Sequence, residues 1–340
     1  MRDYFLKRLA LIPPTLLGVT LIVFAITRLV PGGPLERAIM EAQVMDAGTG
    51  SFSSSAGQTM AISEDQLEQL KAYYGFDKPV LESYVIWLGK IFRADLGTSY
   101  RYNEPVWDVI KSRFPVSIYY GLVTLVLTYA VCIPLGVLKA VRHRTTIDTA
   151  SSILIFIGYA VPGYALGSLL LLFFSVRLDW FPMGGFMSFN YDSLSPSEQW
   201  LDIIHHSILP LICYIIGSFA LVTMLLKNHL LENLAADYIR TAIAKGVSFR
   251  NAVLKHALRN SMIPIATTFG QNITLLVGGS FLIESIFDID GFGLLGLTSI
   301  LDRDYPVVMG VVLLSSLLLF IGNVLSDLLV ALVDPRITFQ

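Results

Sequence analysis

The sequence predicts an all-α integral membrane protein with six transmembrane helices, and three observations indicate this fold class. Of its 340 residues, 54% are hydrophobic and only 15% are charged, whereas soluble domains carry about 25% charged residues. Six apolar stretches are each long enough to cross about 30 Å of hydrocarbon. The basic residues of the short connecting loops gather in alternate loops, as they do in multi-pass membrane proteins.

Hydropathy places the six spans at residues 9–27, 116–138, 150–176, 207–226, 262–283 and 305–326, the last continuing to about residue 333. The third predicted span is interrupted by Gly158, Pro162, Gly163 and Gly167, and the fifth contains Gly278 and Gly279. Such residues are either points of bending or points where helices pack closely. The sequence leaves both interpretations open.

Lysine and arginine in the short loops indicate the orientation. The amino end, residues 139–144 and residues 227–261 are basic, whereas the short loops on the other side offer only Arg177 and Arg303. The first loop has more basic residues, but long loops lie outside the rule. Both termini are therefore expected in the cytoplasm. The chain divides into an amino end with the first span (1–30), an extracytoplasmic loop (31–115), a five-helix core (116–333) that includes the cytoplasmic loop 227–261, and a cytoplasmic tail (334–340).

The loop 31–115 is expected to be partly helical. Residues 41–61 are rich in small residues without periodicity and are interpreted as a mobile insertion. A capping box at 63–66 opens a helix that Gly75 closes. A second helix is expected from Pro79 to Phe92, and a third short helix across Trp107. These helices either pack over the bundle or contact the transported substance.

Residues 237–264 form the most charged stretch between the apolar segments of the second half, with Arg240, Lys245, Arg250, Lys255 and Arg259. The pattern predicts two short helices broken at Gly246, in a left-handed conformation that glycine adopts without strain. Tyr238, Thr241, Ala242 and Lys245 share one helical face, and Ser248 is placed to cap the second helix. The stretch is either a docking element or a basic loop on the membrane surface.

Several functional classes lack support. The sequence contains no phosphate-binding loop, HExxH or GxSxG motif, so no catalytic residue is assigned. His205 and His206 are expected at the membrane interface and not on a metal, and Cys132 and Cys213 are expected to be buried apolar groups. The net charge of −2 offers no case for nucleic acid. Because the span cores carry no charge, coupling to an ion gradient is not indicated.

Acidic residues gather at the outer ends of the fifth and sixth spans, opposed only by Arg303: Glu284, Asp288, Asp290, Asp302 and Asp304. One interpretation is ordinary solvation of loops. The other is an acidic mouth that favours cationic peptides or a free amino terminus.

The segments YIRTAIAKG and KHALRNSMIP resemble the cytoplasmic coupling loop of ABC importer permeases. Arg240 stands where the general pattern is acidic and Arg259 where other branches have proline, which is typical of the peptide branch. LVPGGP, YGFDKPVLESY, ADLGTSYR, IPLGV, IESIFDIDGFGLLG, RDYPVVMG and DLLVALVDPRI extend the resemblance over nearly the whole chain. Together they resemble the B-type permease subunit of oligopeptide/dipeptide ABC importers, and LFF…DWFPMGGF with LVDPRI resembles most the Yej-type branch, whose members are associated with uptake of peptides and of microcin C.

The resemblance implies a type I importer permease fold in the bacterial inner membrane and a chain that is not an enzyme. ATP and Mg would be bound by separate ABC ATPase subunits, and the other partners would be a second, non-identical permease and a periplasmic peptide-binding protein. The implied coupling residues are Asp237, Tyr238, Arg240, Thr241, Ala242, Lys245, Gly246 and Val247. The alternatives are a stand-alone channel or secondary carrier, or a permease of the same fold for nickel or another non-peptide substrate.

Overall fold

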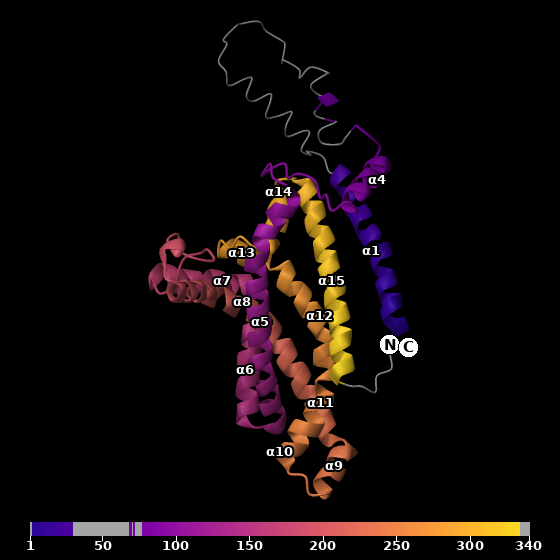
Figure 1. Cartoon of the computed structure of the whole chain (residues 1–340). Helices are drawn as coiled ribbons and strands as arrows, with labels where there is room; N and C mark the ends of the chain where they lie inside the picture. Colours follow the sequence, from indigo (N-terminus) through magenta and orange to yellow (C-terminus); the bar gives the residue numbers. More distant parts are fainter. Residues whose placement is uncertain (1, 30–67, 70, 72–76, 334–340) are drawn as a thin grey trace. The chain divides into compact units, whose positions relative to one another are not determined.

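The computed structural model describes residues 2–29, 68, 69, 71 and 77–333, and its regular elements are helices (Figure 1). Four helices are long and apolar enough to cross a membrane: α1 (Arg2–Leu29), α5 (Val106–Val141), α8 (Pro196–Ala235) and α15 (Tyr305–Val333). Each contains one predicted span, so the expectation of an all-α membrane protein is confirmed. The expectations for residues 41–61, for the capping box at 63–66 and for Gly75 lie outside the described residues.

The third predicted span is broken where its proline lies. Helix α6 (Thr146–Ala160) ends before Pro162, and α7 (Gly163–Leu170) with the π-helical turn Leu171–Arg177 leaves at 91° to it. Proline at this point removes a backbone donor and forces the preceding residue out of the helical region. With this bent pair counted as one span, the described chain has five candidate spans.

The fifth predicted span is divided into two shorter helices. Helix α12 (Ile263–Gly278) is followed by α13 (Phe281–Ile286), and Gly279 between them has φ +62°. Sixteen residues fall just short of the roughly 17–25 that cross a bilayer. The fifth span, and with it the count of six, therefore remains a prediction.

The chain forms two compact units, each described here by itself. Unit 1 comprises Met1–Ile12, Arg113–Leu295 and Ser315–Gln340, and unit 2 comprises Pro13–Ser112 and Gly296–Leu314.

Unit 2 packs α4 (Val80–Ile91) against α1 and the start of α15. Its buried cluster contains Phe24, Tyr84 and Met309, and the Tyr84 hydroxyl lies 2.9 Å from Thr20 Oγ1. Helix α4 begins after Pro79, as predicted. The short helix predicted across Trp107 is instead the first turn of α5, which continues through Pro115; membrane helices tolerate an interior proline where neighbouring groups satisfy the freed backbone.

Unit 1 is built around α8. A buried cluster joins α5, α8 and α13 through Tyr120, Leu209, Cys213, Ile283 and Phe287. The glycines of the bent span lie tightly against α8. A Cβ on Gly163 would lie 3.0 Å from the carbonyl oxygen of Cys213, and one on Gly158 would lie 3.0 Å from Ile216 Cδ1. These distances favour close packing as the role of both glycines.

Candidate functional site

The basic stretch forms a hairpin of short helices in unit 1 (Figure 1). Helix α9 (Asp237–Ala244) is followed by α10 (Phe249–Asn251), a π-helical turn (Ala252–Ala257) and α11 (Leu258–Ser261). Gly246 has φ +91°. Its N–H donates to Ile243 O at 2.9 Å, and Val247 N–H donates to Ala242 O at 3.1 Å, which is the Schellman arrangement. The predicted break at Gly246 is confirmed.

The second limb of the hairpin, which runs from α10 to α11, starts where it was predicted, but the expected side-chain capping hydrogen bond is not formed. Ser248 is the N-cap residue of α10, and its side chain makes no capping hydrogen bond. The turn is therefore fixed by the glycine and its backbone bonds, and the serine contributes mainly a small residue at the right position.

The inner side of the hairpin rests on the ends of two spanning helices. Ile239 is 1% exposed and packs in one cluster with Ala252 and Val253 of the second limb. The same cluster contains Ala140 of α5 and Leu230 of α8, and the half-buried Val247 packs against it. Burial of these apolar groups fixes α9 relative to α5 and α8. The hairpin is therefore packed firmly on the ends of these two helices, and this buried contact is called its seat.

Tyr238 adds a polar brace to this seat. Its hydroxyl donates to Asn233 Oδ1 on α8 at 2.6 Å and accepts from Asn260 Nδ2 on α11 at 3.1 Å. Asn233 Nδ2 in turn donates to Ser261 Oγ at 3.1 Å. The residue remains 40% exposed. Tyr238 therefore joins three helices and still offers part of its ring to a partner.

The outer side of the hairpin presents most of the residues implied in coupling. Ala242 and Val247 are half-buried, and the exposed members are Asp237, Tyr238, Arg240, Thr241, Lys245 and Gly246. Arg240 lies 3.5 Å from Asp237, with both side chains largely exposed, so this pair contributes little to stability. Its charges are available to a partner.

Two exposed apolar residues of the hairpin, Ile243 and Phe249, were not among the predicted coupling residues. Ile243 is 43% exposed and Phe249 is 51% exposed. Large apolar side chains that are exposed on a hairpin rich in charged residues are typical of interface anchors. For Phe249 the signal was available, because it is the one aromatic residue between Ser248 and Pro264. Ile243 lies four residues after the buried Ile239, so helical spacing places both on one face and suggests that both are buried.

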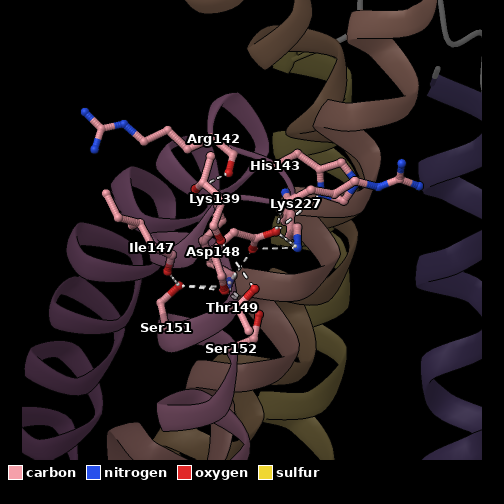
Figure 2. A network of polar contacts seen from close by, with 11 residues as sticks. Lys139, Arg142, His143, Ile147, Asp148, Thr149, Ser151, Ser152 and Lys227 are labelled. Carbon is pink, nitrogen blue, oxygen red and sulfur yellow. Dashed lines mark hydrogen bonds and ion pairs between the residues drawn. The ribbon is translucent and has the colours of Figure 1, made fainter.

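A buried ionic cluster joins α5, α6 and α8 beside this seat (Figure 2). Lys227 Nζ lies 2.7 and 2.9 Å from the two carboxylate oxygens of Asp148, and Lys139 Nζ lies 3.0 Å from Asp148 Oδ1. The Lys139 side chain has no exposed surface, and it also donates to Ser151 Oγ at 2.9 Å and to Ser152 Oγ at 2.7 Å. One carboxylate thus neutralises part of the charge of two ammonium groups.

The cluster and the hairpin seat share the same helices. Lys139 directly precedes Ala140 on α5, and Lys227 lies one turn before Leu230 on α8. The sequence showed these lysines only as cytoplasmic positive charge and gave no sign of Asp148. The cluster locks α6 to the two helices on which the hairpin rests.

The predicted outer acidic residues fall in both units. In unit 1, Asp288 and Asp290 are exposed, and Asp290 pairs with Arg113 at 3.0 Å. Glu284 is 2% exposed and accepts from Leu294 N–H at 2.6 Å, in the first turns of α14 (Phe292–Leu301). A Cβ on Gly291 would lie 2.7 Å from the Glu284 carboxyl carbon. Glu284 therefore holds α13 against α14 from inside the fold.

In unit 2, Asp302 pairs with Arg101, and Asp304 is 1% exposed. The Asp304 carboxylate accepts from Ser99 Oγ and from the N–H groups of Tyr100 at 3.1 Å and Arg101 at 3.3 Å. It anchors the loop before α5. Arg101 and Arg113 thus oppose acidic groups that the sequence left to Arg303 alone.

Comparison with known proteins identifies a family. Residues 132–339 match the model described as binding-protein-dependent transport system inner membrane component. The chain is 36% identical to the peptidoglycan transport system permease protein YejB of Agrobacterium fabrum, over 100% of this chain and 99% of that protein. It is 37% identical to the inner membrane ABC transporter permease protein YejB of Escherichia coli O157:H7, with both chains covered fully. The oligopeptide transport system permease protein AppB of Bacillus subtilis is 36% identical, again over both full lengths.

Among solved structures, an inward-facing form of the MetNI methionine ABC transporter matches with a TM-score of 0.50. The match covers 66% of this chain and 96% of that chain at 18% identity. At this identity the likeness concerns the fold alone.

Proposed function

Since the chain belongs to the inner-membrane components of binding-protein-dependent transport systems, in the oligopeptide/dipeptide family of ABC importer permeases, we propose that it forms half of a peptide translocation pathway. A permease of this family is a non-catalytic membrane subunit, and ATP is hydrolysed on partner subunits. The other half of the pathway is a second, non-identical permease, and a periplasmic protein delivers the peptide. The chain crosses the bacterial inner membrane six times with both termini in the cytoplasm, and residues 31–115 lie in the periplasm.

The observation that carries the proposal is the seated hairpin. Residues 237–247 dock in a groove of the ATPase, as a short helix docks in a groove. A lever transmits motion only if it is rigid at its base. The buried Ile239, the Tyr238 brace and the Schellman turn at Gly246 supply that rigidity, and closure of the ATPases would then move α5 and α8 together.

Peptides are the proposed cargo, and microcin C is a candidate within that class. A second candidate is the peptide part of peptidoglycan, because the Agrobacterium relative is named for peptidoglycan transport. The test is reconstitution in vesicles with the partner permease, ATPases and binding protein, followed by uptake of labelled trialanine, a muropeptide, microcin C and nickel. ATP-dependent uptake of trialanine supports the proposal. Uptake by the isolated chain would support the channel or carrier instead.

The exposed apolar residues of the hairpin yield a prediction. Phe249→Ser and Ile243→Ser are expected to weaken ATPase binding by about thirtyfold or more each, since loss of a buried interface anchor typically costs about 2 kcal/mol or more. Affinity is measured by titrating labelled ATPase onto the permease pair in nanodiscs. The matched control is Phe249→Leu, which keeps an apolar side chain and should bind within about threefold of the unaltered protein. If both serine variants bind the ATPase as tightly as the unaltered protein does, Phe249 and Ile243 are not part of the interface.

Of the acidic residues predicted to attract cationic peptides, Glu284 and Asp304 are buried, so the exposed carboxylates are the ones that can act on the peptide. We propose that Asp288 and Asp290 favour lysine-containing over glutamate-containing tripeptides by a few fold, since exposed charges act weakly through water. Asp288→Asn with Asp290→Asn should abolish the preference in the uptake assay. The control is Asp192→Asn, an exposed carboxylate of another loop. If the preference is unchanged in the double variant, these carboxylates only solvate their loop and do not select the peptide.

A further inference from the structure

Unit 1 contains a cavity of about 370 Å³ among α5, α7, α8 and the α12–α13 junction. More than half of the described residues that line it carry a hydroxyl or an amide, and none of them carries a charge. Cavities of this size hold small ligands, with a few placed polar groups among apolar ones.

Two of its lining residues have unsatisfied hydroxyls. Thr124 and Thr128, one turn apart on α5, are 5% and 3% exposed. Neither Oγ1 has a hydrogen-bond partner within the described part of the chain. A buried polar group left unpaired costs about 1–3 kcal/mol. These hydroxyls are therefore groups that an incoming ligand can satisfy.

Three other polar side chains of the wall, those of Tyr129, Tyr214 and Asn272, are held in place by hydrogen bonds. Asn272 Nδ2 donates to the Tyr129 hydroxyl at 2.8 Å. The Tyr214 hydroxyl donates to Glu284 Oε1 at 3.2 Å and accepts from Ser280 N–H at 3.3 Å. The buried Glu284 thus fixes a cavity residue from behind without placing a charge in the cavity. On α8, a Cβ at Gly217 would meet nothing within 4 Å, so this stretch of the wall is open.

We propose that this cavity is a transit site that binds the main chain of the peptide, an assignment that rests on the proposed function. A peptide that leaves water needs partners for its amide N–H and C=O groups. Threonine and tyrosine hydroxyls can donate or accept, and the asparagine amide does both. Because the lining is uncharged, the site reads the main chain, which all peptides share, and is indifferent to the charge of their side chains.

The test uses the complete reconstituted complex and labelled trialanine. Thr124→Val with Thr128→Val keeps the shape of the wall and removes both hydroxyls. We expect the initial uptake rate to fall about tenfold, which corresponds to about 1.4 kcal/mol, while stimulation of ATP hydrolysis by the loaded binding protein persists. The matched control is Thr223→Val, since Thr223 is also fully buried on a spanning helix but does not line the cavity. Its uptake should remain within about twofold.

A second variant covers the case in which the threonine pair fails to assemble. Gly217→Leu on α8 places a side chain in the open part of the cavity and should reduce trialanine uptake below about a tenth at normal complex yield. Unaltered uptake in either assembled variant overturns the transit site. Failure of the unaltered complex to take up trialanine, with uptake of nickel instead, overturns the proposed function itself, so the two results are distinguishable.

Discussion

Replacing Asp148 by asparagine is expected to lower the free energy of unfolding by about 3–5 kcal/mol, the typical effect of removing one partner of a buried ion pair. The substitution leaves the ammonium groups of Lys139 and Lys227 facing each other in a site where the Lys139 side chain has no contact with solvent. Asparagine keeps the size of the side chain and one acceptor oxygen. The loss would therefore report charge and not packing.

Unfolding is measured for the permease in detergent by titration with a denaturant, together with the yield of assembled complex. The matched control is Asp237→Asn, whose carboxylate is 95% exposed and 3.5 Å from Arg240; it should change stability by less than about 0.5 kcal/mol. A triple variant, Asp148→Leu with Lys139→Met and Lys227→Met, should recover most of the stability, because apolar groups can replace a complete buried ionic cluster. If the Asp148→Asn variant is as stable as the unaltered protein, the two lysine ammonium groups do not depend on a buried negative charge at Asp148.

The long helices and the hairpin could be predicted because their signals are local. Apolar stretches of sufficient length identify α1, α5, α8 and α15, and proline at 162 marks the third span as a candidate for bending, which is where the structure breaks it. The left-handed turn at Gly246 follows from glycine beside a helical pattern. Each of these features depends on residues within one or two turns of each other.

The features that the sequence did not reveal depend on contacts between distant residues. Gly279 was noted in the sequence as a point of bending or close packing, but not the reason for the division of the fifth predicted span. The buried Glu284 carboxylate accepts from the Tyr214 hydroxyl 70 residues away and would overlap a Cβ on Gly279, and a hydropathy average does not register these contacts. The same holds for Asp148, whose partner Lys227 is 79 residues away. From the sequence alone, charged groups near the ends of spans are expected to be exposed to solvent. Only the tertiary fold shows which of them are buried.

The early start of α5 has a different reason. Pro115 and the polar residues before it suggest a boundary between loop and span, yet the helix is continuous from Val106. Val106 and Ile110 are fully buried, and a Cβ on Gly310 would lie 2.8 Å from Val106 Cγ1. Burial of this first part against α15 stabilises helix where local preference alone favours a break.

Replacing Gly246 by valine is expected to reduce peptide uptake by the complete complex at least tenfold while the protein remains inserted. Valine is strained at φ +91° by about 1–2 kcal/mol, although there is space for its Cβ. The strain is relieved if the turn changes conformation, which breaks the bonds from Gly246 and Val247 to the end of α9. The exposed surface of α9 then loses its fixed angle to the second limb.

The measurement compares uptake with ATP hydrolysis in the same vesicles. We expect hydrolysis to lose its response to the peptide-loaded binding protein, because the ATPase now contacts a surface that yields instead of transmitting motion. The matched control is Gly246→Asn, since asparagine tolerates the left-handed conformation better than other residues and should retain most of the uptake. If valine and asparagine behave alike and both transport normally, the turn is not part of the lever, and coupling must pass through residues of the hairpin that do not depend on its angle.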